Sequence, residues 1–178
     1  MLSGLVIRDC EKRDLERITA IYGRSVREET ASFELTAPDL EEMTRRRADL
    51  AAKAYPYLVA ELEGAIVGYA YASEYRPRPA YRHTIETTVY VDQEVQRGGI
   101  GRALMERLIE EAEAHGFRQM VAVIGDSAHI PSIEFHKALG FTYAGNLVSV
   151  GYKHGKWLDS LLLQRVLGQG DSSPPERA

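Results

Sequence analysis

The chain has 178 residues, 44% of them hydrophobic, which predicts one domain with a single well-packed core. Its 22 basic and 26 acidic residues leave a net charge of -4, so we expect no nucleic-acid partner and no anionic membrane partner. Because Cys10 is the single cysteine, no apolar run approaches the ~20 residues of a membrane span, and the first residues lack a signal-peptide pattern, the expected location is the cytoplasm.

Strand and helix patterns alternate along the first half of the chain. The expected elements are a strand at 5–8, a helix with apolar positions from 15 to 26, a second helix after Pro38-Asp39, strands at 57–61 and 65–71, and a central strand at 87–91. Prolines in the loop 75–81 forbid a regular strand or helix there. Cys10 is expected to be buried at the end of the first strand and not to act as a nucleophile.

The second half continues the alternation. The expected elements are a helix from the end of a glycine-rich loop to Gly116, a strand at 120–124, a short helix at 132–139, and strands at 144–153 and 157–164 joined by a turn at His154-Gly155. The unbroken apolar run at 120–124 is typical of a strand covered on both faces. Residues 1–167 are expected to form the domain, with 168–178 as a disordered tail. The order predicts an α/β fold with a mixed sheet and helices on both faces.

The glycine-rich loop Gln96-Arg97-Gly98-Gly99-Ile100-Gly101 lies between the central strand and a helix, a context that favours phosphate binding. A Walker loop needs Lys and then Ser or Thr after its last glycine, but Arg102 and Ala103 follow here. A dinucleotide fingerprint would need a third glycine where Leu104 stands. The spacing Gln-x-x-Gly-x-Gly resembles instead the coenzyme A loop of the GNAT superfamily of N-acetyltransferases.

The resemblance becomes closer in the segments 86–91, 121–125 and 151–159, which are similar to those of the phosphinothricin N-acetyltransferase family. It covers about residues 7–164. It implies the GNAT acyl-CoA N-acyltransferase fold, β-α-α-β-β-β-α-β-α-β-β, acetyl-CoA as donor, a small-molecule amine as acceptor and a homodimer built on the C-terminal strands with Trp157. Phosphinothricin, methionine sulfoximine and methionine sulfone are the implied acceptors. No metal is expected, because His83, His115 and His154 lack metal-ligand spacing.

The resemblance implies roles for residues around the central strand. Glu86 takes the place of the general base; the alternative is a strand-end carboxylate that faces solvent. Val89, Tyr90 and Val91 would bind the pantetheine arm through their backbone, although the same residue types suit plain sheet core. The coenzyme A pyrophosphate would lie on the loop, at Gln96 and on the backbone amides of Arg97, Gly98, Gly99, Ile100, Gly101 and Arg102.

Residues after the next strand complete the donor side. His136 stands where the wider superfamily shows a tyrosine acid, and it could protonate the departing thiolate or bind a substrate anion; the alternative is a helix histidine packed at a rim. Ser132 and His129 would contact the donor, although asparagine is usual at position 129. Met105 aligns with a substrate-site tyrosine of the typical enzymes, so we expect it near the acceptor.

On the acceptor side, the resemblance implies an aromatic wall at Phe33, contacts from Thr88, and anion or ring contacts from Arg76, Arg78 and Tyr81. Two arginines on a proline-rich loop also suit an ordinary solvated surface. Transfer would be direct, because no activated cysteine is present. Other possible functions are acetylation of a peptide N-terminus, an aminoglycoside or another amine, and a non-catalytic acyl-CoA-binding module.

Overall fold

The computed structural model describes residues 4–95 and 98–176, and within them the expected order of strands and helices is confirmed. The elements are β1 Leu5–Asp9, α1 Leu15–Glu28, α2 Leu40–Ala52, β2 Tyr57–Leu62, β3 Ala65–Glu74, β4 Thr84–Val91, α3 Ile100–Ala114, β5 Gln119–Ile124, α4 Ile130–Ala138, β6 Thr142–Lys153 and β7 Lys156–Val166. The strands form one seven-stranded sheet in the order β1-β2-β3-β4-β5-β7-β6. All neighbours are antiparallel except β4 and β5, so the mixed α/β sheet is confirmed.

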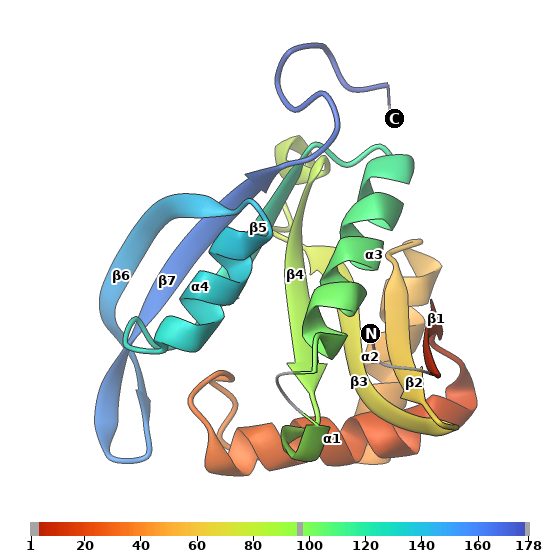
Figure 1. The fold of residues 1–178 in the computed structure, drawn as a ribbon. Helices are drawn as coiled ribbons and strands as arrows, with labels where there is room; N and C mark the ends of the chain where they lie inside the picture. Colours follow the sequence, from red (N-terminus) through yellow and green to blue (C-terminus); the bar gives the residue numbers. More distant parts are fainter. Residues whose placement is uncertain (1–3, 96–97, 177–178) are drawn as a thin grey trace.

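Helices cover both faces of this sheet. Figure 1 shows α3 and α4 in front of it, and α1 crosses its lower edge. Strand alternation explains the two cores: Leu58 on β2 packs in the α3 cluster, whereas its neighbour Val59 packs in the α1 cluster. Each helix presents its apolar stripe to its own face, with Leu104 of α3 and Ile18 of α1 both fully buried.

The parallel pair β4–β5 separates halfway along its length. Thr84–Thr87 pair with Gln119–Ala122, and the ladder between these two strands ends there. Beyond that point β4 continues beside β3, while Val123 and Ile124 of β5 continue beside β7. Figure 1 shows the two strands diverging towards the end where α3 begins. This divergence is what positions the site.

Two details of the sequence interpretation are wrong. The loop 75–81 contains a 3₁₀ turn at Pro79–Tyr81, because proline at the first helical position has the right φ and needs no N–H partner. The run 120–124 is not covered on both faces throughout, since Val123 is 36% exposed where β5 leaves β4.

The chain ends were also interpreted from the sequence. Cys10 is buried beyond β1, as expected. The disordered tail stays a prediction; residues 168–171 form turns, and Arg118 donates hydrogen bonds to the carbonyl oxygens of Gly170 and Pro174. Among the described residues, no helix combines the length and the apolar character needed to span a membrane.

Candidate active site

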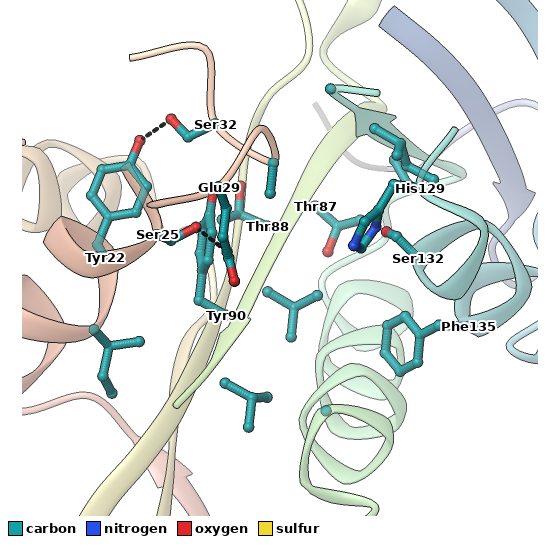
Figure 2. A pocket seen from close by; sticks show the side chains of 18 of the residues that line it. Tyr22, Ser25, Glu29, Ser32, Thr87, Thr88, Tyr90, His129, Ser132 and Phe135 are labelled. Carbon is teal, nitrogen blue, oxygen red and sulfur yellow. Dashed lines mark hydrogen bonds between the residues drawn. The ribbon is translucent and has the colours of Figure 1, made fainter. Parts of the chain in front are cut away.

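A cleft of about 910 Å³ passes through the opening between β4 and β5. Its lining comes from α1 and the following loop on one side, from α4 on the other, and from the start of α3. Figure 2 shows Tyr22, Ser25 and Glu29 across the central strand from His129, Ser132 and Phe135. The cleft therefore has two halves, one on each face of the sheet, that meet at β4.

Alternation along β4 divides its residues between these halves. Val89 packs against the α3 core and Thr87 donates its hydroxyl hydrogen to the Met105 sulfur of α3 at 3.3 Å, whereas Tyr90 packs against the α1 core. Glu86 and Thr88 share the face of Tyr90, by the two-residue period of a strand. The strand thus presents polar side chains to the α1 half of the cleft, and its backbone edge to the opening.

Glu86 lines the cleft where the two strands part. It lies beside Val121 of β5 and Ser73 of β3, one residue before the last β4–β5 pair. Its side chain is partly buried, and this burial raises the pKa of the carboxyl group. A carboxylate whose pKa is raised in this way is a stronger base, so the environment suits general-base chemistry.

We call the half on the side of α3 and α4 the donor half and the half on the side of α1 the acceptor half; the N-terminus of α3 lines the donor half. Gly99 is the N-cap residue with φ of +85°, and it lines the cleft together with Ile100, Gly101 and Arg102. Because the first N–H groups of a helix have no intrahelical partner, this end favours an anion. Gly98 is exposed and is not part of the lining, and Gln96 and Arg97 lie outside the described residues.

His136 borders the donor half from α4 and is 6% exposed. Its Nδ1 lies 2.8 Å from the carbonyl oxygen of Ser132, and burial lowers its pKa. A carbonyl oxygen can only accept, so Nδ1 carries the hydrogen and the neutral ring leaves a lone pair on Nε2. Near neutral pH, therefore, Nε2 of His136 is a hydrogen-bond acceptor and carries no proton to donate.

His129 and Ser132 both line the cleft at the start of α4, as Figure 2 shows. The loop before them is fixed by Asp159 of β7, which accepts a hydrogen bond from the Ser127 hydroxyl at 2.6 Å. The backbone N–H of His129 donates to the carbonyl of Asp126 at 2.9 Å. These bonds fix the backbone that places the exposed His129 at the cleft.

Two of the five expected acceptor residues, Phe33 and Thr88, line the cleft. Arg76, Arg78 and Tyr81 do not line it in this chain. Arg76 instead covers the Tyr81 ring at 5.6 Å and the Tyr75 ring at 5.1 Å. The aromatic rings hold this loop in a compact fold of its own, which agrees with the surface alternative.

Met105, which was expected near the acceptor, does not line the cleft and contacts it only through the hydroxyl of Thr87. Met105 is fully buried in α3 and belongs to the core beneath β4.

The sequence reasoning missed the polar lining that α1 contributes. The Ser25 hydroxyl donates to Glu29 at 2.6 Å, and the side-chain amide of Gln93 donates to the other Glu29 oxygen at 2.7 Å. Tyr22 and Tyr71 complete this wall. A signal was present: Ser25 sits on the apolar stripe of α1 and is buried, which is unusual for a serine without a polar environment.

Comparison with known proteins agrees with this geometry. Residues 7–162 match the family model described as acetyltransferase (GNAT) domain. The chain is 48% identical to a phosphinothricin N-acetyltransferase from Alcaligenes faecalis, over 96% of this chain and 85% of that protein. It is 38% identical to an L-methionine sulfoximine/L-methionine sulfone acetyltransferase from Pseudomonas aeruginosa, over 94% and 98% of the two chains.

A solved structure is also similar throughout. It is a GNAT superfamily phosphinothricin acetyltransferase from Sinorhizobium meliloti in complex with AcCoA, which is 44% identical and superposes with a TM-score of 0.95. The match covers 98% of this chain and 95% of that chain. By its sequence, its fold and its divided cleft, the chain belongs to the GNAT acetyltransferase family.

Proposed function

We propose that the protein transfers the acetyl group of acetyl-CoA to the amine of a small amino-acid analogue of the phosphinothricin, methionine sulfoximine or methionine sulfone type. The observation that carries this proposal is the position of Glu86, a partly buried carboxyl group at the meeting point of the two halves of one cleft. The two kinds of acceptor are those named for the relatives at 48% and 38% identity.

The donor half suits coenzyme A. The edge of β4 at residues 88–90 has no ladder partner on β5, both strands being fully described, so its peptide groups can bond the amides of a pantetheine arm. The N-terminus of α3 offers backbone N–H groups to a pyrophosphate. Gly99 keeps this approach open, because a Cβ there would meet no described atom within 4 Å, whereas Gly101 lies close to the side chains of Phe135 and Val91.

The residues present support direct attack of the amine on the thioester. Glu86 accepts the ammonium proton of the acceptor, directly or through water, and a backbone N–H of β4 stabilises the developing oxyanion. The single cysteine, Cys10, is 2% exposed and burial raises its pKa to about 11, so it is unsuited to carry an acetyl group.

His136 can act as an acid only in its protonated form. As the neutral ring described above, it must first receive a proton at Nε2 before it can protonate the departing thiolate. In its neutral form it can instead accept a hydrogen bond from the coenzyme A thiol.

We also propose a cytoplasmic homodimer, with no nucleic-acid or membrane partner. Support comes from exposed apolar residues along β6 and the start of β7: Tyr143, Leu147, Val148, Val150, Tyr152 and Trp157. The net charge of -4 argues against polyanionic partners. Sedimentation equilibrium of the wild type and of Trp157→Glu tests the dimer; a monomeric wild type would refute it.

Release of coenzyme A tests the function. Wild type, Glu86→Gln and the exposed-site control Glu16→Gln are assayed with methionine sulfoximine and with peptide amines. We expect saturable turnover of methionine sulfoximine, a loss of about 10²–10⁴ in kcat for Glu86→Gln, and no change for the control. Turnover of peptides alone would overturn the proposed acceptor. Binding of acetyl-CoA without turnover of any amine would leave only a binding module.

A further inference from the structure

Lys153, at the end of β6, is the buried member of a pair of lysines that flank one turn. It is 4% exposed, whereas its cross-strand partner Lys156 has a side chain that is 58% exposed. Burying an ammonium group is unfavourable unless the group is bonded. Its Nζ donates to the carbonyl oxygen of Ser32 at 2.7 Å, joining segments 121 residues apart. A buried cation is thus directed at the loop between α1 and α2.

Ser32, whose carbonyl oxygen accepts from Lys153, makes further hydrogen bonds through its hydroxyl group. The Ser32 hydroxyl lies 2.9 Å from the Tyr22 hydroxyl and accepts a hydrogen bond from the N–H of Glu34 at 3.1 Å. Figure 2 shows the Tyr22–Ser32 bond beside the cleft. Burial lowers the pKa of Lys153, and the carboxylates of Glu29 and Glu34 oppose that shift. The loop therefore contains an anchored serine directly before the cleft-lining Phe33.

Two glycines provide the space in which the Phe33 ring lies. A Cβ added at Gly125 would come within 2.8 Å of the ring and 2.7 Å of the Thr30 carbonyl oxygen, and one added at Gly151 would overlap the ring. Gly151 is on the same strand as Lys153, two residues away. Strand β6 thus meets the loop twice, through a hydrogen bond to Ser32 and through a close backbone approach to Phe33.

We propose that Lys153 is a positioning residue for the acceptor: by holding the Ser32 carbonyl it fixes the Phe33 wall against Gly125 and Gly151. The inference rests on the proposed function, in which Phe33 borders the acceptor half of the cleft. Lys153 does not line the cleft itself, so it acts through the loop and not on the reacting atoms. The place of the wall limits the size and direction of the acceptor side chain.

Lys153→Met tests this role, because methionine keeps much of the side-chain volume but leaves the Ser32 carbonyl without its donor. We expect KM for methionine sulfoximine to rise about tenfold, with kcat and KM for acetyl-CoA changed by less than about twofold. Lys53 is an exposed lysine, with 57% of its side chain accessible, and serves as the control. Lys53→Met should leave both KM values and kcat as in the wild type.

A double-mutant cycle separates positioning from general stability. If Lys153 acts through Phe33, then Phe33→Ala alone should raise KM for methionine sulfoximine. Adding Lys153→Met to Phe33→Ala should raise this KM by less than about twofold more. Additive effects, or a fall in kcat with both KM values unchanged, would overturn the inference.

Hydrogen exchange tests the inference independently of activity. Amides of residues 30–34 should exchange about tenfold faster in Lys153→Met than in wild type or Lys53→Met. Unchanged exchange would refute the anchoring role. If wild type fails to acetylate methionine sulfoximine, the proposed function fails, while the exchange result still decides whether Lys153 fixes the loop.

Discussion

Replacing Gly99 by alanine separates the cost of a strained backbone from the loss of a ligand contact. Gly99 has φ of +85° and ψ of 0°, and a Cβ there would meet no other atom of the described residues within 4 Å. The cost in stability is therefore backbone strain without a packing clash, about 1–2 kcal/mol for a residue with a Cβ in the left-handed region. At about 2–4 °C for each kcal/mol, this predicts a clearly measurable fall in Tm.

The same Cβ would project into the open space where we place the pyrophosphate. We therefore expect KM for acetyl-CoA to rise at least about tenfold, because the backbone N–H groups can no longer approach the anion closely. Steady-state kinetics with acetyl-CoA varied, together with calorimetric unfolding, measure the two effects separately.

Gly64 provides a matched control in the β2–β3 turn. It has φ of +84°, and a Cβ there also meets no described atom within 4 Å. Gly64→Ala should therefore lower Tm about as much as Gly99→Ala and leave KM for acetyl-CoA unchanged. An unchanged KM in Gly99→Ala would refute the donor loop, and an unchanged Tm in both variants would refute the strain argument.

Three further predictions concern ionisable groups. Because burial raises the pKa of Glu86, kcat/KM should fall as pH drops through a value above the usual carboxyl range, and a Glu86→Gln profile should lose that limb. Cys10, with a pKa of about 11, should react with a thiol reagent at neutral pH only after unfolding, which rapid labelling in the folded state would contradict. Asp14, 3% exposed, accepts from Arg8 at 2.7 and 2.9 Å and from the N–H of Glu11 at 2.8 Å. Asp14→Ala should cost about 1.5–3 kcal/mol in urea unfolding without changing kcat, because Arg8 loses these hydrogen bonds but keeps its ion pair with Glu61; a cost below about 0.5 kcal/mol would contradict this. Since its partners lower the pKa of Asp14, the stability that it contributes should be lost as pH falls through that lowered value.

The sequence predicts the elements well because their signals are local. The apolar spacing of α1, the strand–glycine–helix order before α3 and the cap of α2 each lie within a few residues. At the start of α2, for example, the Asp39 carboxylate accepts from the N–H of Glu42 at 2.9 Å, which is what the pattern Pro38-Asp39 indicates.

Features that depend on contacts between distant segments could not be predicted from the local sequence. The end of the β4–β5 ladder depends on how two separate strands pass each other, and only the resemblance, which gives the backbone of Val89, Tyr90 and Val91 to the pantetheine arm, points to it. Lys153 resembles any surface lysine in its local sequence, because its partner Ser32 is 121 residues away. Arg76 has the charge expected of an anion-binding residue, yet its neighbours Tyr75 and Tyr81 occupy its guanidinium group.

The opening between β4 and β5 leaves part of the sheet without its backbone hydrogen bonds. Residues 88–90 pair with β3 on one side only, whereas a central strand normally pairs on both. A donor that bonds to this edge takes the place of a missing strand, and it does so only in the folded state. Saturation at a hundred times Kd would add about 2.7 kcal/mol to the free energy of unfolding. The free energy of unfolding of the chain should therefore rise with the concentration of its own co-substrate.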